Sequence, residues 1–244
     1  MTSVVRRSSP AAITGMASLA VAVVMVGGLD VRNALASADE LRRTISQYGL
    51  GPDRWIFNLG VLALAVGSVL VLAPLVRRGI TTWRSGASIA MWLWAIGLVV
   101  VVAVPKQDWS QPQSIGGDIH RLASVVAFVA LPFAAILLSR RWRRDEMWGR
   151  YAQWTFGLGI ASAVAFLPLI YSIVGSIVTG TPWYRLITLG WVERVLVVVE
   201  VLAVIAIGVW AVVAAPVGRE KESSRTPFRA RVPKAPTESN TPAP

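Results

Sequence analysis

The sequence predicts an all-α fold: a polytopic membrane bundle of six transmembrane helices, with a short outer amphipathic helix and a disordered C-terminal tail. Of the 244 residues, 55% are hydrophobic and 15% are charged, whereas soluble domains carry about 25% charged residues. Six long apolar runs contain most of the hydrophobic residues, and the charges gather in short clusters between them. This pattern excludes a soluble enzyme, a fibrous protein and a fully disordered chain.

Each apolar run is long enough to cross a bilayer core of about 30 Å, which needs roughly 20 residues of helix. The runs are continuous instead of alternating, and they are about twice the length of a membrane β-strand, so a β-barrel is excluded. The predicted spans are residues 11–29, 55–76, 87–105, 119–139, 154–178 and 193–215. Three parts follow: a cytoplasmic N-terminus (1–10), the six-helix domain (11–215) and a basic tail rich in Ser, Thr and Pro (216–244).

The basic residues predict the orientation of the chain. Sixteen of the 24 Lys and Arg residues lie in the N-terminus, the second and fourth loops and the tail, and six lie in the odd-numbered loops. The positive-inside rule then places both termini in the cytoplasm of a multi-pass protein of the cell membrane. The net charge of +11 suggests nucleic-acid binding as an alternative, but the charges are divided among membrane-flanking loops. We therefore expect the bilayer, and no nucleic acid, as a partner.

The first span has a second interpretation. Arg6 and Arg7, an apolar run and then Ala34-Leu35-Ala36 resemble a signal peptide with its small-residue cleavage site. Cleavage would leave five spans and an outer N-terminus. The apolar run is about 19 residues long, which exceeds the usual 7–15 and favours a retained span.

The first outer loop, residues 30–54, contains a candidate surface helix. Ser37 and Glu40 are spaced as in a capping box. Leu41, Ile45 and Tyr48 follow at helical spacing, with Arg42 and Arg43 on the polar side. We expect a short amphipathic helix on the outer surface, with a simple connector as the alternative.

Polar residues that could carry chemistry are few, and most lie on the outer side. The chain has no cysteine and one histidine, so disulfides, thiolate sites and multi-histidine metal sites are excluded, and we expect no metal and no cofactor. The expected outer polar cluster combines the third loop with the starts of the fourth and sixth spans, and we predict a carboxylate–cation contact between the two span starts. Its members are Asp108, Asp118, His120, Arg121, Glu193 and Arg194. Each also has a structural interpretation, because carboxylates cap helix N-termini and arginines reach for headgroups.

Glu200 differs from this cluster because it lies deeper. It follows Glu193 by seven residues, so it is on nearly the same helix face and about 10 Å further into the membrane. A carboxylate near the bilayer centre costs about 2.5–3.5 kcal/mol on insertion scales, so it is expected to face the bundle interior and to have a partner.

Three short motifs resemble the domain-of-unknown-function family 998, whose members are six-helix membrane proteins, mainly prokaryotic. Val104-Pro105, Asp108, Gly117 and His120 with Leu122-Ala123-Ser124 look like its central signature; Gly190-Trp191-Val192-Glu193-Arg194 looks like its final motif; and Gly51-Pro52, Trp55, Asn58 and Gly60 resemble its second-span entry. The resemblance covers residues 11–215 and implies the six-helix fold and a polar outer site, but no reaction. A bacterial source is expected from the heavy use of Ala, Val and Arg.

Three functions are compatible with these residues. The leading hypothesis is a non-catalytic protein that binds a lipid or another membrane protein through the outer polar cluster, because no complete set of nucleophile, base and orienting group can be assembled. An intramembrane lipid hydrolase or transferase would use Asp108, Asp118, His120 and Glu193 around a divalent ion. A small proton-coupled transporter would use Glu200 as its titrating group, with Pro132 and Pro168 as kinks.

Overall fold

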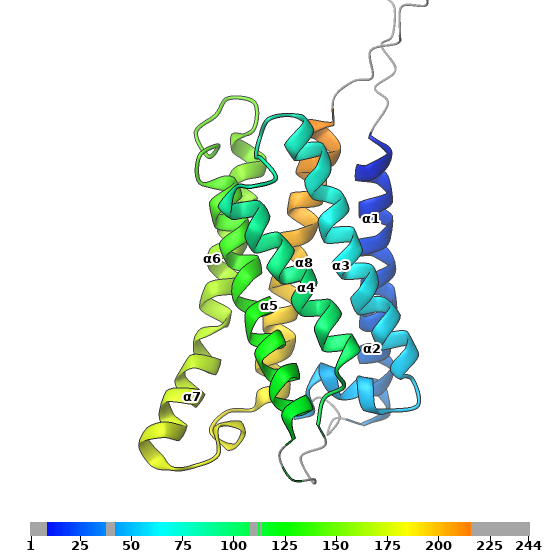
Figure 1. Cartoon of the computed structure of the whole chain (residues 1–244), viewed down its shortest axis with the longest axis vertical. Helices are drawn as coiled ribbons and strands as arrows, with labels where there is room; N and C mark the ends of the chain where they lie inside the picture. Colours follow the sequence, from blue (N-terminus) through cyan, green and yellow to red (C-terminus); the bar gives the residue numbers. More distant parts are fainter. Residues whose placement is uncertain (1–8, 38–41, 108–111, 113, 216–244) are drawn as a thin grey trace, which may run out of the picture.

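Six helices cross the molecule side by side in the computed structural model, which describes residues 9–37, 42–107, 112 and 114–215 (Figure 1). Within the described residues, six helices are long and apolar enough to cross a membrane. Four are single helices: α3 (Arg54–Arg77), α4 (Gly86–Ala103), α5 (Ile115–Ser139) and α8 (Leu189–Ala214). The first and fifth spans, Pro10–Ala36 and Gly149–Thr179, are interrupted. The predicted all-helical, six-span fold is confirmed, and the chain is a multi-pass membrane protein.

The first span is longer than predicted. It runs through α1 (Pro10–Ala22), a π-helical turn (Val23–Gly27) and α2 (Gly28–Ala36). Asp30 is therefore a helical residue and not the start of the outer loop, which corrects the predicted boundary. The apolar run ends at Leu29, but the helix continues because a partner for the Asp30 carboxylate is supplied from α8, as described below.

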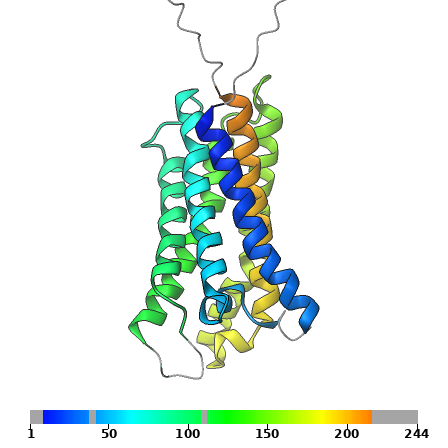
Figure 2. The ribbon, with the colours of Figure 1, turned by 90° about the vertical axis from the view of Figure 1, so that its right-hand side faces the viewer.

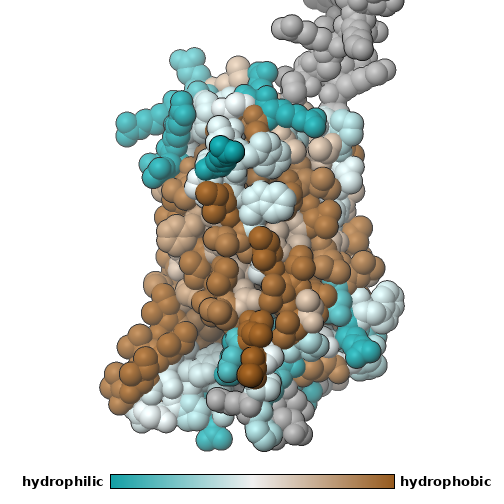
Figure 3. All heavy atoms as spheres, in the orientation of Figure 1, coloured by the Kyte–Doolittle hydropathy of each residue, from teal (hydrophilic) through white to brown (hydrophobic). Residues whose placement is uncertain are grey.

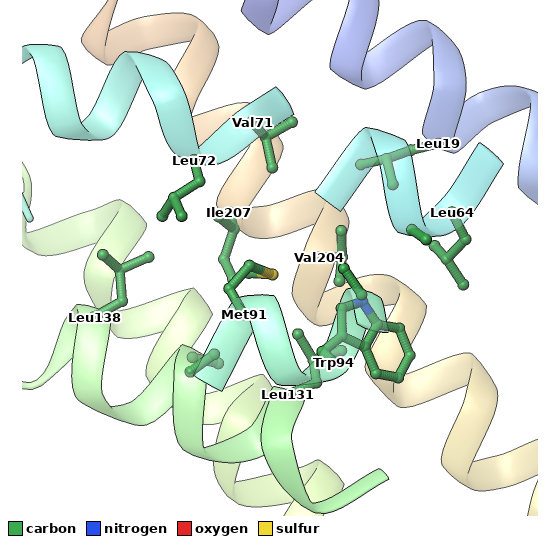
Figure 4. Close-up of a cluster of buried hydrophobic side chains, with 14 of the residues drawn as sticks. Leu19, Leu64, Val71, Leu72, Met91, Trp94, Leu131, Leu138, Val204 and Ile207 are labelled. Carbon is green, nitrogen blue, oxygen red and sulfur yellow. The ribbon is translucent and has the colours of Figure 1, made fainter. Parts of the chain in front are cut away.

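Small residues set the closest helix crossings. A Cβ on Gly67 of α3 would lie 3.0 Å from the carbonyl oxygen of Gly15 on α1. A Cβ on Gly97 of α4 would lie 3.0 Å from the carbonyl oxygen of Ala123 on α5. The side chains that fill the space between these helices are aliphatic or aromatic and include Leu19, Leu72, Met91, Trp94, Leu131 and Ile207 (Figure 4). Close backbone approach of this kind is how helices associate in lipid.

The fifth span breaks in the middle of the membrane. It consists of α6 (Gly149–Ala165) and α7 (Leu167–Thr179), with Phe166 between them and Pro168 in the first turn of α7. The break agrees with the predicted kink at Pro168, because proline removes a backbone donor. At Pro132, by contrast, α5 continues as one helix. Figure 1 shows α7 turning away from α5 and α8, and Ser172 is its one buried residue.

The two ends of the bundle differ. The first and last described helices, α1 and α8, begin and end at the same end (Figure 2), which also carries the loops after α3 and α5 and is called the basic end. The opposite end, called the loop end, carries the 3₁₀ helices Ile45–Leu50 and Trp183–Arg185. Figure 3 shows hydrophilic residues at both ends of an apolar belt. The even number of spans puts the ends of the six-helix domain on one side, as predicted.

The segment between α2 and α3 is helical but not as predicted. Its described helix is a 3₁₀ helix over Ile45–Leu50, whereas residues 38–41 lie outside the described residues. Ile45 is buried against the bundle and Arg42 and Arg43 are exposed, so the predicted polar and apolar sides are confirmed for these residues. Residues 42–52, the outer loop, dock on the bundle through hydrogen bonds to α8.

Candidate functional site

A cavity lies at the loop end, between α5, α7 and α8 and beneath the outer loop, and is called the first cavity. It has a volume of about 520 Å³, which is within the usual range for small-molecule sites. His120 and Arg121 of α5 and Glu193 of α8 line it, so three of the predicted site residues surround one space. The lining also includes Ser46, Lys106, Leu122, Val125, Phe128, Phe166, Leu169 and Ile173.

The lining of this first cavity changes from polar to apolar with depth. Lys106, His120 and Glu193 lie near the helix starts at the loop end. Phe128 of α5 is eleven residues beyond Gly117, or about 16 Å further along the helix axis. Phe166, at the break between α6 and α7, also lines the deep part. The break in the fifth span therefore creates the apolar end of the cavity.

The first cavity opens sideways. Three of its apolar lining residues are well exposed in the structure: Leu122 by 65%, Val125 by 40% and Ile173 by 43%. Leu122 and Val125 belong to α5 and Ile173 to α7, so the opening lies where α7 turns away from α5 (Figure 1). At this depth the surroundings of a membrane protein are acyl chains, so a lipid can enter without passing through water.

A second cavity of about 200 Å³ lies on the other side of Lys106 and His120, between α3, α4 and the outer loop. Arg54, Phe57 and Asn58 of α3 line it. Ser46, Lys106 and His120 line both cavities. These three residues therefore form the wall between two spaces at the loop end.

His120 occupies this wall in a fixed orientation. Its Nδ1 is 2.8 Å from the carbonyl oxygen of Val104, at the end of α4, and 4% of the residue is exposed. A carbonyl oxygen only accepts, so Nδ1 carries the proton. Nε2 has no hydrogen-bond partner among the described residues. The ring thus ties α4 to α5 through one nitrogen and presents the other as an acceptor.

Glu193 caps the outer loop. Its two carboxylate oxygens accept hydrogen bonds from the backbone N–H groups of Ile45 (2.9 Å) and Ser46 (3.3 Å). These are the first donors of the 3₁₀ helix, which have no partner within the helix itself. A carboxylate from α8 therefore performs the role that a local N-cap residue usually performs. This contact explains why the loop helix starts at Ile45 and docks on the bundle.

Arg194 forms a second attachment of the outer loop. Its Nε and Nη2 donate to the Asp30 carboxylate at 2.8–3.1 Å, and its Nη1 donates to the Arg43 carbonyl oxygen at 2.7 Å. The Tyr48 hydroxyl donates to the Asp30 carboxylate at 2.8 Å and accepts a hydrogen bond from Arg194 Nη2 at 3.3 Å. Burial, followed by the hydrogen bond to Asp30, raises the pKa of Tyr48 above its usual value of 10.0. The network joins α2, the outer loop and α8.

Gly190 makes this docking possible. A Cβ at Gly190 would lie 2.5 Å from the carbonyl oxygen of Arg42 and 2.6 Å from that of Arg43. The outer loop therefore runs directly over the backbone of α8. Within about one helical turn, Gly190 leaves space for the outer loop, Glu193 caps its 3₁₀ helix and Arg194 pairs with Asp30. The polar residues of this motif therefore have a structural role.

The remaining predicted site residues have different outcomes. Arg121 pairs with Asp118, three residues before it on α5. No ion pair joins the starts of α5 and α8 within the described part of the chain. The predicted contact between these segments therefore stays a prediction, with Asp118 and Asp30 as the partners found for Arg121 and Arg194. Asp108 lies outside the described residues.

Glu200 faces the bundle interior, as predicted, with 0% of the residue exposed. It is not among the residues that line either cavity. Neither carboxyl oxygen has a hydrogen-bond partner among the described residues, so the expected donor is not found there.

No three His, Asp or Glu side chains of the described residues come together as metal ligands. Asp118 pairs with Arg121 and Glu193 accepts two backbone hydrogen bonds, so both carboxylates already have partners. The four-residue ion site considered from the sequence is therefore not assembled by its described members.

Sequence reasoning missed several residues of this region. The sequence places Asp30 at the start of a loop, although an acidic residue directly after an apolar run can mark a helix end that needs a cation. Lys106 counts in the sequence only as one of the orientation charges. The apolar residues Phe166, Leu169 and Ile173 could not be distinguished from other span residues, because only the break before α7 turns them toward the cavity.

The fold and this arrangement define an integral membrane protein with a lateral cavity below a clamped outer loop. Residues 16–210 match the family described as Protein of unknown function (DUF998), and the chain belongs to this family. The match covers all six spans except the ends of the first and the last, and it confirms the resemblance derived from the three motifs. No curated protein and no solved structure matches the chain.

Proposed function

We propose that the protein binds an amphiphilic lipid in the first cavity, without chemical conversion. The polar group of the lipid would lie at Lys106 and His120, and an acyl chain would lie between Phe128 and Leu169. The observation that carries the proposal is the combination of a polar-to-apolar lining with an opening toward the membrane at Leu122 and Ile173. A soluble ligand would need neither the apolar depth nor the lateral opening.

Orientation belongs to the same proposal: the loop end faces the outside of the cell membrane, and both termini are cytoplasmic. The support is the excess of basic residues at the basic end. Because the chain contains no cysteine, single cysteines at the exposed positions Thr82 and Thr188 report the two sides. An impermeant thiol reagent should label Thr188→Cys on intact cells and leave Thr82→Cys unlabelled, and the reverse result would invert the orientation.

Filling the cavity tests lipid binding directly. Leu169→Trp places an indole ring in the apolar end of the first cavity. The control, Ile160→Trp, places the same ring at a residue that is 42% exposed and lines neither cavity. Each full-length variant is purified in mild detergent, and the lipid that stays bound is measured by mass spectrometry. We expect Leu169→Trp to lose most of the bound lipid and Ile160→Trp to keep it. Equal lipid content in both variants and the parent protein would refute the proposal.

The two alternative functions have separate tests. Lipid turnover by the purified protein that stops in His120→Asn would favour the hydrolase or transferase. Proton-dependent uptake in liposomes that stops in a folded Glu200→Gln variant would favour the transporter. Glu200 lies outside both cavity linings, and the carboxylates near His120 have protein partners. We therefore favour lipid binding over both alternatives.

A further inference from the structure

The second cavity has a cationic lining. Arg54 and Lys106 line it, together with the polar side chains of Ser46, Asn58 and His120, and no Asp or Glu is among its described lining residues. The closest acidic residue along the chain, Asp53, is paired with Arg32 of α2. No carboxylate is among the described residues that line this cavity, and the Lys106 ammonium is also close to Glu193 in the first cavity, so Arg54 is the lining charge that an anionic group would meet first.

Two side chains at this cavity have no partner within the described part of the chain. The guanidinium of Arg54 makes no hydrogen bond or ion pair there, in contrast to Arg32 and Arg194, which each bind an aspartate. The amide of Asn58 makes no hydrogen bond there either. Each side chain offers donors, and Asn58 also offers an acceptor, so both are suited to a ligand with several oxygen atoms.

His120 adds a third, independent group. It is more than nine-tenths buried, and Nε2 has no partner among the described residues. With the proton held on Nδ1 by the Val104 carbonyl, the neutral ring accepts at Nε2, and its natural complement is a hydroxyl group. A buried acceptor without a donor is unfavourable, and a ligand hydroxyl would supply the missing hydrogen bond.

We propose that the second cavity is the headgroup subsite for the lipid in the first cavity, and that the headgroup is a phosphodiester carrying hydroxyl groups. Arg54 and Lys106 would bind the phosphate oxygens, and His120 and Asn58 would bind the hydroxyls. The subsite adjoins the first cavity through the shared wall of Ser46, Lys106 and His120. This inference rests on the proposed lipid binding and adds the chemical class of the lipid.

Three probe lipids separate the parts of this headgroup. Phosphatidylglycerol has a phosphodiester and two hydroxyls, phosphatidylmethanol has the phosphodiester alone, and phosphatidylcholine has a phosphodiester with a cationic, hydroxyl-free headgroup. Binding of each to the detergent-purified full chain is measured by native mass spectrometry. We expect phosphatidylglycerol to bind most tightly and phosphatidylcholine least, with a difference of about tenfold or more, as for a charge-assisted hydrogen bond. Equal affinities for all three lipids would overturn the inference.

Variants then assign the preference to residues. Arg54→Gln should remove the preference for phosphatidylglycerol over phosphatidylcholine, and Arg54→Lys should restore part of it. The matched control is Arg185→Gln, which removes an arginine at the loop end that lines neither cavity. His120→Asn retains a donor for the Val104 carbonyl and should lose only the preference for phosphatidylglycerol over phosphatidylmethanol. The inference fails if Arg54→Gln behaves like Arg185→Gln.

Inorganic phosphate distinguishes a lipid headgroup from a free anion. Displacement of phosphatidylglycerol only at high phosphate concentration, together with loss of all lipid binding in Leu169→Trp, supports a lipid headgroup site. Tight phosphate binding that Leu169→Trp does not alter would overturn the lipid assignment. If Leu169→Trp loses lipid while headgroup preference is absent, the proposed function stands and this inference alone fails.

Discussion

Two arginines at the loop end, Arg194 and Arg54, illustrate how differently the same side chain is used. Arg194 is 7% exposed and binds the Asp30 carboxylate and the carbonyl oxygens of Arg43 and Gly190. Arg54 lines the second cavity and has no partner among the described residues. Both lie near the start of a span, and both suit the same sequence pattern of a basic residue at a membrane boundary.

The difference separates structure from binding. The Arg194 guanidinium holds the outer loop in place, and because its N–H donors already bind protein oxygens, few of them remain for a ligand. A guanidinium beside a cavity, next to Asn58 and the free Nε2 of His120, is available for one. The polar groups that have partners at the loop end, Asp30, Tyr48, Glu193 and Arg194, hold the outer loop on the bundle and are called the frame. The polar groups without partners there mark the binding site.

The largest expected effect comes from breaking the frame at Arg194. Arg194→Gln leaves Asp30 half-buried without its cation, and we expect a loss of about 3–5 kcal/mol, as for other broken buried pairs. Arg54→Gln, in contrast, should leave stability nearly unchanged. Thermal unfolding in detergent compares the two variants. Equal destabilisation would show that Arg54 is also part of the frame.

Gly190→Ala tests the contact between the outer loop and α8. The added Cβ meets backbone atoms of Arg42 and Arg43, which cannot move independently of the loop. Overpacking of this kind costs about 1–3 kcal/mol. The matched change is Gly157→Ala in α6, where a Cβ meets nothing within 4 Å and where alanine should stabilise the helix slightly. Similar unfolding temperatures for the two variants would contradict the close contact.

Tyr48→Phe removes one hydroxyl from the frame and should cost about 1 kcal/mol, the usual net value of a hydrogen bond. It also has a pH signature. Because the pKa of Tyr48 is raised in the folded protein, the stability due to its neutral form is complete below pH 10. That contribution is lost as the pH rises through the raised pKa. The parent protein should lose this increment at alkaline pH, and Tyr48→Phe should not.

The smallest effect is expected at Glu200, the buried polar group that belongs to neither the frame nor the cavities. Its carboxyl oxygens have no partner among the described residues, so Glu200→Leu replaces an unsatisfied group with an apolar one of similar size. We expect the unfolding temperature to stay equal or to rise, and Glu200→Gln to change it little. A loss of several kcal/mol in Glu200→Leu would reveal a partner, such as a bound water, that the protein needs.

Much of the fold was predictable because each span is a local property of the chain. The long apolar runs determine six helices, since backbone polar groups in lipid must be satisfied within the helix. Pro168 indicated the break in the fifth span, and the motif at Gly190 indicated the family. Asp30 was misplaced because the end of its helix depends on Arg194, which is 164 residues away.

The sequence by itself determined the class of protein, the number of spans, the interior position of Glu200 and the list of candidate polar residues. It could not decide which of these residues hold the outer loop and which line a cavity, because His120, Glu193 and Arg194 are all polar residues near the start of a span. Only the tertiary structure made that distinction, through partners far apart in the chain: Glu193 with Ile45, and Arg194 with Asp30. The first cavity likewise depends on the divergence of α7, a property of helix packing that no local pattern carries.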